Sequence, residues 1–146
     1  MARRKVTIKN RIRRAIDRQK GEVIFPSDFR SFGSSSQVSR ALRILIEEGR
    51  IVRLGYGVYA KSRPSSLSGI PVPRVTLPEL TKEVLEKWRI PVRLGRAQSA
   101  YAEGRTNQVP VHTAFYTGKR RITRKITVGK RTVIFENDFN SKKRDF

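Results

Sequence analysis

The clearest alternation of apolar and polar positions lies in residues 34–61. In SSSQVSRALRILIEEG, Val38, Leu42 and Leu45 recur at helical spacing, while serines and arginines occupy the other side. A serine at its start can cap this helix, and Gly49 can end it. The next residues, IVRLGYGVYAK, are two β-branched runs around a glycine-bracketed turn, which is typical of a hairpin. The pattern predicts a helix with a polar, basic face that leads directly into a two-stranded hairpin.

Two weaker patterns precede this helix. Isoleucines at helical spacing over residues 8–16 predict a first helix, which Gly21 can end. The segment PSDFRSFG then predicts a short helix capped by Ser27, followed by a turn at Gly33. The short helix, the turn and the next helix form a helix-turn-helix. With the hairpin as its wing, we expect a winged helix-turn-helix domain over residues 1–63.

The remainder of the chain predicts a second, different domain. Residues 64–74 are rich in proline, serine and glycine without periodicity and are expected to be a linker. An amphipathic pattern predicts a helix over residues 76–88, and a second helix is expected at 96–103. Alternating runs around glycine turns then predict strands. The fold class is therefore α+β, with a small helix-plus-antiparallel-sheet domain at 75–138 and a disordered basic tail at 139–146.

Charge narrows the choice of partners. The 146 residues hold 33 Lys and Arg but only 12 Asp and Glu, for a formal net charge of +21. Residues 1–64 hold sixteen basic and five acidic residues (+11), and residues 65–146 hold seventeen and seven (+10). The excess is spread over the whole chain. A positive charge spread in this way favours a polyanion as binding partner, because lysines and arginines that neutralise phosphates release condensed counterions.

Specific roles follow for the helix and hairpin. The N-terminal residues of a recognition helix contact base edges, so Gln37 could read adenine and Arg40 could bind guanine through two hydrogen bonds. Arg43, one turn later, is better placed for a phosphate. The predicted DNA-binding residues are Ser35, Ser36, Gln37, Ser39, Arg40 and Arg43 on the helix, Arg53, Tyr56 and Lys61 on the hairpin, and Arg3, Arg4 and Lys5 in a basic arm.

Catalysis has little support in the sequence. The chain has no cysteine and a single histidine, His112, in an expected strand without a neighbouring carboxylate pair. No nucleotide-binding glycine loop of the Walker type and no metal-ligand spacing is present. We expect no enzyme activity, no cofactor and no metal. No apolar run approaches the ~18 residues of a membrane-spanning helix, and no signal-peptide core follows the basic start, so we expect a cytoplasmic protein without a membrane partner.

Two segments resemble a known family. The run SSQVSRALRILIEEGRIVRLGYGVY resembles the winged-helix module of AbiEi-like antitoxins from bacterial type IV toxin–antitoxin systems, and NQVPVHTAFYTGKRRITRKITVGKRTVIFE resembles their downstream segment. The resemblance covers about residues 20–137. It implies an N-terminal domain that represses its own operon by binding double-stranded promoter repeats, within the bacterial cytoplasm and at the nucleoid. It also implies a C-terminal antitoxin domain that counters a nucleotidyltransferase-type toxin.

Other interpretations stay open. The basic C-terminal half could contribute a second nucleic-acid contact. The chain could also be a basic winged-helix protein that binds RNA or the ribosome, or a phage-type inhibitor that binds an acidic protein, and its oligomeric state is not predicted. The possible second-contact residues are expected on adjacent strands: Lys119, Arg120, Arg121, Arg124, Lys125, Lys130 and Arg131.

Overall fold

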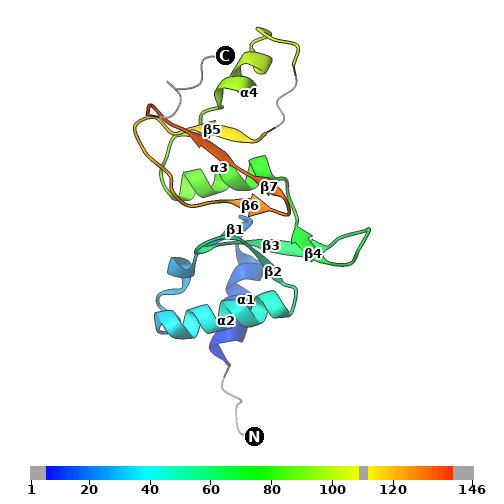
Figure 1. The fold of residues 1–146 in the computed structure, drawn as a ribbon. Helices are drawn as coiled ribbons and strands as arrows, with labels where there is room; N and C mark the ends of the chain where they lie inside the picture. Colours follow the sequence, from blue (N-terminus) through cyan, green and yellow to red (C-terminus); the bar gives the residue numbers. More distant parts are fainter. Residues whose placement is uncertain (1–5, 109–111, 140–146) are drawn as a thin grey trace, which may run out of the picture. The chain divides into compact units, whose positions relative to one another are not determined.

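The computed structural model describes residues 6–108 and 112–139 and divides the chain into two compact units. The first unit is Met1–Val75 and the second is Thr76–Phe146 (Figure 1). Both combine helices with short strands, which confirms the α+β class. The predicted arm residues Arg3, Arg4 and Lys5 and most of the predicted tail lie outside the described residues. No helix in the described part of the chain is long and apolar enough to cross a membrane.

The first unit places three helical segments beside one antiparallel sheet. Strand β3 is central, with β1 and β4 and the hairpin partner β2 paired to it. In chain order the elements are α1 (Ile8–Arg18), β1 (Val23–Ile24), the 3₁₀ helix η1 (Pro26–Phe29), α2 (Ser35–Glu47), β2 (Ile51–Gly55), β3 (Val58–Pro64) and β4 (Pro71–Pro73).

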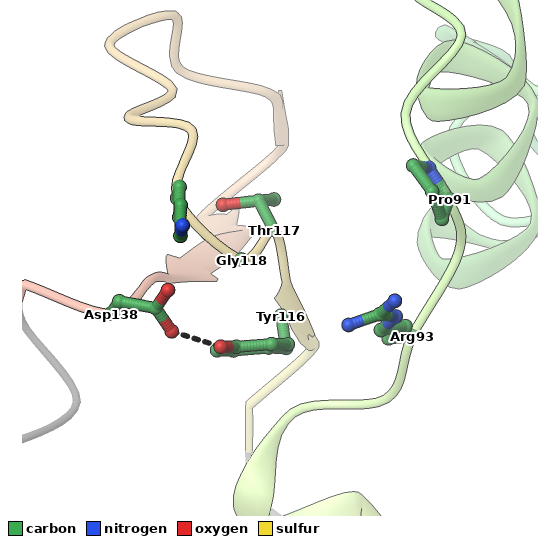
Figure 2. Close-up of a pocket in the computed structure, with 7 residues that line it drawn as sticks. Pro91, Arg93, Tyr116, Thr117, Gly118 and Asp138 are labelled. Atoms are coloured by element: carbon green, nitrogen blue, oxygen red, sulfur yellow. Dashed lines mark hydrogen bonds between the residues drawn. The ribbon is translucent and has the colours of Figure 1, made fainter.

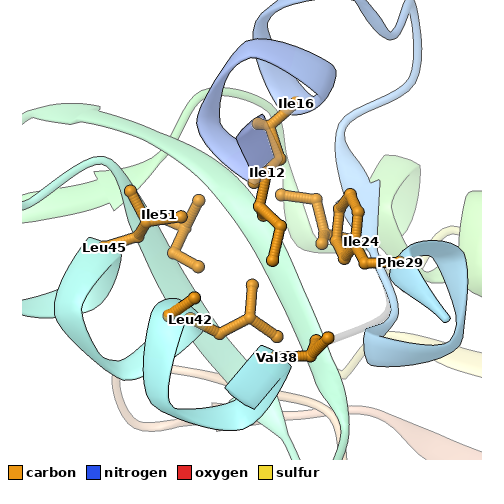
Figure 3. Packing of buried hydrophobic residues seen from close by; sticks show 9 residues of the cluster. Ile12, Ile16, Ile24, Phe29, Val38, Leu42, Leu45 and Ile51 are labelled. Atoms are coloured by element: carbon orange, nitrogen blue, oxygen red, sulfur yellow. The ribbon is translucent and has the colours of Figure 1, made fainter. Parts of the chain in front are cut away.

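The core of the first unit joins both helices to the sheet. Ile12 from α1, Leu42 and Leu45 from α2 and Ile51 from β2 are each 0% exposed and belong to one cluster (Figure 3). Each fully buried leucine or isoleucine contributes about 1.5–3 kcal/mol relative to an exposed one. The predicted apolar faces of α1 and α2 are therefore confirmed, and they are what holds α2 in place.

The ends of α2 are defined by its sequence. At the start, Ser34 Oγ accepts from the Gln37 N–H at 3.2 Å, and Gln37 Oε1 accepts from the Ser34 N–H at 2.9 Å, a reciprocal capping box. At the other end Gly49 has a φ of 75°, and the Arg50 N–H donates to the Leu45 carbonyl at 3.0 Å. This arrangement closes the helix and turns the chain into β2.

Two local predictions in the first unit were wrong. Ser27 does not cap the short helix; instead the Asp28 carboxylate accepts from the Phe25 N–H at 3.0 Å. Residues 64–74 are not only a linker, because Pro71–Pro73 forms β4 and pairs with the end of β3. Prolines lack the N–H of a central strand, but an edge strand tolerates them. Composition alone could not separate an edge strand from a linker.

In the second unit, the helices α3 (Leu77–Lys87) and α4 (Arg96–Ala102) match the prediction, and the strands are shorter than predicted. The strands are β5 (Ala114–Tyr116), β6 (Thr127–Val128), β7 (Arg131–Thr132) and β8 (Ile134–Glu136). The largest side chains that are fully buried in the described part of this unit are Leu80, Val84, Leu85, Phe115 and Ile126.

The expected antiparallel sheet of the second unit is only partly present. Strands β6 and β7 form the predicted antiparallel hairpin, but β5 and β8 pair in parallel. Parallel strands cannot be joined by a tight turn. The chain between β5 and β8 therefore makes a crossover, in which residues 121–126 are not a strand.

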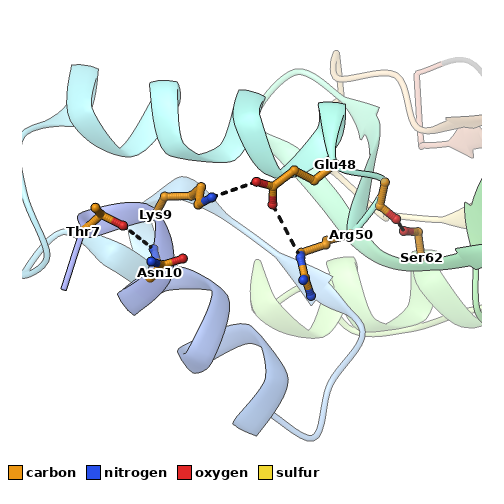
Figure 4. A network of polar contacts seen from close by, with 7 residues as sticks. Thr7, Lys9, Asn10, Glu48, Arg50 and Ser62 are labelled. Carbon is orange, nitrogen blue, oxygen red and sulfur yellow. Dashed lines mark hydrogen bonds and ion pairs between the residues drawn. The ribbon is translucent and has the colours of Figure 1, made fainter. Parts of the chain in front are cut away.

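An ion-pair network links the first helix to the end of α2 (Figure 4). Lys9 Nζ on α1 donates to Glu48 Oε1 at 2.7 Å, and Arg50 Nε lies 3.5 Å from Glu48 Oε2. The hydrogen bond from Lys9 lowers the pKa of the Glu48 carboxyl below its ordinary 4.5, against a smaller, opposing effect of desolvation. The network fixes the C-terminal end of α2 relative to α1.

Replacement of Leu42 by alanine should destabilise the first unit. Leu42 is 0% exposed, and such truncations cost about 2–5 kcal/mol. The measurement is urea unfolding followed through the backbone amide signals of the first unit. Exposed Ser39 on the same helix offers a control, because Ser39→Ala should change stability by less than about 0.5 kcal/mol. Equal stability of both variants would contradict the packing described above.

Replacement of Glu48 by glutamine should alter how stability depends on pH. Because the folded state lowers the pKa of Glu48, its contribution is present above pH 4.5 and is lost as the pH falls through the folded-state value. The wild-type protein should therefore lose more stability on acidification than Glu48→Gln. Urea midpoints at a series of pH values measure this, with Glu47→Gln as a charge-matched control. Parallel acid profiles for wild type and Glu48→Gln would exclude the effect.

Candidate nucleic-acid interface

The outward side of α2 carries the side chains that the sequence pattern predicts to contact DNA. These side chains are exposed because the buried positions Val38, Ala41, Leu42 and Leu45 take the opposite side of the helix. The structure thereby brings serines, an amide and two arginines together along one helix face. The exposed residues are Ser35, Ser36, Gln37, Ser39, Arg40 and Arg43.

The side chain of Gln37 forms part of the N-terminal cap of α2. Its Oε1 accepts from the Ser34 N–H, so in this arrangement the oxygen is not free to accept from the N6 amine of adenine. The two-bond reading of adenine that the sequence suggested would require the capping box to open. Gln37 can still donate through its amide nitrogen. Its main local role is to order the start of α2.

Arg40 and Arg43 are the cations of this face. Both are exposed, and neither forms an ion pair with another described residue. The first turn of α2 contains no acidic side chain, and the nearest acidic residues along the helix are Glu47 and Glu48 at its far end. The two guanidinium groups therefore remain available to an external anion or base edge.

Two features at the start of α2 were missed by sequence reasoning. The Arg11 guanidinium of α1 lies 5.0 Å from the centre of the Phe32 ring, two residues before the cap Ser34, and adds a cation beside the helix start. A Cβ at Gly33 would approach Gln37 Oε1 to 2.7 Å and Ile8 Cδ1 to 3.0 Å. Glycine at this position thus permits the close approach of α1 and α2. An arginine on the polar side of an amphipathic helix carries no signal that it will stack on a distant ring.

The β2–β3 hairpin presents two of its predicted residues. Tyr56 at the tip is 76% exposed, and Gly57 after it has a φ of 67°, which only glycine adopts without strain. Arg53 is exposed, and its Nε donates to the Gly55 carbonyl at 3.1 Å. This bond uses Nε and leaves the terminal guanidinium nitrogens of Arg53 without a hydrogen-bond partner among the described residues.

Lys61 does not fit the candidate interface, because it is buried. It is 8% exposed, and its Nζ donates to the Gln19 carbonyl at 2.6 Å. The side chain ties β3 to the end of α1 and is buried by the same packing that orders the sheet. Sequence position on the hairpin suggested a phosphate contact, but a residue on β3 alternates between the two faces of the sheet, and Lys61 takes the inward one.

The seven cations of the possible second contact are exposed but do not lie on adjacent strands. Lys119 follows β5, Lys130 is in the β6–β7 turn, and only Arg131 is in a strand. The other four occupy residues 120–125 of the crossover. The expectation failed because this basic segment has too few apolar positions to pair as a strand: Ile122 is half-buried, and the next buried residue is Ile126.

Several of these arginines contact other residues of the second unit, to which they belong. Arg121 lies 4.1 Å from the ring centre of Phe139, and Arg124 lies 5.7 Å from that of Trp88. Arg120 donates to the Arg89 carbonyl at 3.3 Å. These contacts hold the three arginine side chains against their own unit, which limits their reach toward a partner.

His112 lies outside the predicted strand. It is exposed in a bend before β5, not in a strand, and its carbonyl accepts from the Gln98 side-chain amide. The described residues contain no group of three or more His, Cys, Asp or Glu side chains that could hold a metal ion.

Comparison with known proteins gives a family but no activity. No curated protein matches the chain. A family profile matches residues 7–143, nearly the whole chain, and it is described as a family of unknown function, DUF6088. On this match, the chain belongs to the DUF6088 family.

Proposed function

We propose that the first unit is a winged helix-turn-helix that binds duplex DNA in a sequence-specific manner. In this proposal η1 and α2 form the helix-turn-helix, α2 is the recognition helix, and the β2–β3 hairpin is the wing. One observation carries it. The face of α2 that is not needed for the core is basic, exposed and free of acidic residues over its first turn.

The chemistry of α2 suits both bases and phosphates. Arg40 offers the two-donor geometry that guanine O6 and N7 accept. Arg43 and Arg11 would contact the backbone on either side of the groove. The N–H groups of Ser35 and Ser36 have no acceptor among the described residues, and such groups at a helix start favour a phosphate. Together these groups would orient the helix and read part of the sequence.

The hairpin would add a contact outside the groove. A tyrosine at an exposed tip can lie along the sugar-phosphate backbone while Arg53 supplies charge. Both side chains project from a sheet that shares its core with α2. The wing and the recognition helix are thus held by one packed unit, as a simultaneous contact requires.

Duplex DNA is favoured over RNA by the aromatic residues. Recognition of RNA sequence relies on exposed rings that stack unpaired bases. In the described part of the first unit, Tyr56 is the one exposed aromatic side chain, while Phe29 is buried and Phe25, Phe32 and Tyr59 are half-buried. A single ring at a hairpin tip is a poor platform for a run of bases.

The wider biological role is also a proposal. A protein that occupies an operator would repress the adjacent promoter, and the resemblance to AbiEi-like antitoxins suggests that the operon is its own. That resemblance further suggests that the second unit counters a nucleotidyltransferase-type toxin. Co-expression with the product of a neighbouring nucleotidyltransferase gene tests this role, since an antitoxin restores growth and an unrelated protein does not.

Alanine at Arg40 or Arg43 should weaken DNA binding. Loss of a two-donor contact to guanine costs about 1–3 kcal/mol, roughly 5- to 150-fold in affinity, and relaxes specificity at one base pair. Fluorescence anisotropy with the protein's own promoter fragment measures the change for Arg40→Ala. Arg43→Ala should weaken binding to all sequences alike. Lys20→Ala, an exposed cation outside the candidate interface, is the control.

Unchanged affinity in the Arg40→Ala, Arg43→Ala double variant would remove α2 from the interface.

Competition with a structured RNA of equal length distinguishes sequence-specific DNA binding from RNA binding. If the RNA displaces the promoter fragment as well as unlabelled promoter does, sequence-specific DNA binding is excluded.

Binding should depend steeply on salt. Neutralisation of about six to eight phosphates gives a slope of about −5 to −7 for the logarithm of affinity against that of salt concentration. Arg43→Ala should reduce the magnitude of this slope by about one, whereas Lys20→Ala should leave it unchanged. A slope near zero would show that the +21 charge takes no part in binding.

A further inference from the structure

The second unit contains an open cavity that the proposed DNA interface does not use. Its volume is about 300 Å³, and Figure 2 shows Tyr116 and Asp138 on one side and Arg93 and Pro91 on the other. All of the residues around it belong to the second unit. They are Pro91, Arg93, Tyr116, Thr117, Gly118, Lys119 and Asp138.

Backbone hydrogen bonds fix the walls of this cavity. The Tyr116 N–H donates to the Arg93 carbonyl at 2.9 Å, and the Asp138 N–H donates to the Gly118 carbonyl at 2.8 Å. Gly118 itself has a φ of 66°, and a Cβ there would meet no atom within 4 Å. The glycine is thus required by its turn, and it leaves the adjacent space empty.

The charges around the cavity are unequal. Arg93 and Lys119 are exposed and form no ion pair with another described residue. Among the described lining residues the one carboxylate is Asp138, which accepts from the Tyr116 hydroxyl. That hydrogen bond, aided by burial, raises the pKa of Tyr116 against the opposing charge of Arg93, so the hydroxyl stays protonated at neutral pH. Two free cations therefore face one carboxylate that retains an oxygen for a further donor.

We infer that this cavity binds one nucleotide, with its phosphate on Arg93 and Lys119. The flat base would lie against Pro91 and the Tyr116 ring, as bases do on aromatic side chains in single-strand binding proteins. An amine or hydroxyl of the nucleotide would donate to Asp138. Asp138 favours a nucleotide over a bare anion. A phosphate alone would only be repelled by the carboxylate, whereas a nucleotide also carries a donor that the carboxylate can accept from.

The volume of about 300 Å³ lies at the lower end of the range for small-molecule sites, which suits a ligand of about one nucleotide. Two sources share this chemistry. The nucleotide could be a free monophosphate, or an unpaired nucleotide at the end of a nucleic-acid strand. An acidic peptide would also meet the two cations, but it offers neither a flat ring for Tyr116 nor a reliable donor for Asp138.

Calorimetric titration of the full chain with AMP, inorganic phosphate and adenosine tests the inference. AMP should bind more tightly than either of its parts. Arg93→Ala and Lys119→Ala should each weaken AMP about tenfold, the value of one charge-assisted hydrogen bond. Lys82→Ala is the matched control, because Lys82 is exposed on α3 in the same unit and does not line the cavity. Amide spectra of each variant show whether the unit remains folded.

Asp138→Asn separates a nucleotide site from a simple anion site. It removes the repulsive charge but keeps an acceptor for Tyr116, so affinity for inorganic phosphate should rise while the preference for AMP over phosphate falls. If AMP binds no better than phosphate in the wild-type protein, or if the Arg93 and Lys119 variants bind AMP normally, the inference is wrong. Displacement of AMP by a phosphate-free acidic peptide at equal concentration would instead assign the site to a protein partner.

Two DNA duplexes identify the source of the nucleotide. One is blunt, and the other carries a single 5′-phosphorylated unpaired nucleotide. Tighter binding of the second, lost in Arg93→Ala, assigns the cavity to strand ends; equal binding of both, with AMP still bound, assigns it to the free nucleotide. The Arg40→Ala, Arg43→Ala double variant removes only the proposed contact between α2 and the duplex. It should therefore weaken the binding of both duplexes equally and leave AMP binding unchanged. Failure of the DNA proposal and failure of the nucleotide site therefore give different results.

Discussion

Burial of one face of α2 against α1 and the sheet is the constraint on which the first unit depends. The leucines of α2 share their cluster with Ile12 of α1 and Ile51 of β2, and each contributes on the order of 1.5–3 kcal/mol. A helix with one face occupied in this way must turn its other face outward. The serines and arginines of α2 are accordingly exposed, and the Lys9–Glu48 ion pair and the Ser34 capping box fix its two ends. The candidate interface is thus a direct consequence of the core.

Local patterns predicted the first unit well because its signals are local. Helical spacing identified α1 and α2, and the cap and the terminal glycine of α2 lie within three residues of the positions that they serve. The hairpin followed from its Gly–Tyr–Gly turn. The failures were of a different kind. Lys61 is buried and donates to the Gln19 carbonyl, 42 positions away, and the Arg11 guanidinium lies over the Phe32 ring. No spacing rule encodes such partners.

The second unit shows the same limit more strongly. Its helices α3 and α4 were predicted, but the parallel pairing of β5 with β8 depends on how the chain crosses between them. The cations of that crossover were identified, whereas the cavity beside Arg93, Tyr116 and Asp138 was not. These three residues come from segments more than twenty positions apart, and none belongs to a recognisable motif. Charge is visible in composition, while a cavity exists only after folding.

The most direct test of the central claim is an NMR titration of the full chain with its own promoter duplex. We expect the largest amide shifts on the start of α2, from Ser35 to Arg43, and on the hairpin tip around Tyr56. Buried Leu45 and Lys61 should change little. Shifts confined to the second unit, with α2 unaffected at saturating DNA, would contradict the assignment of α2 as the recognition helix.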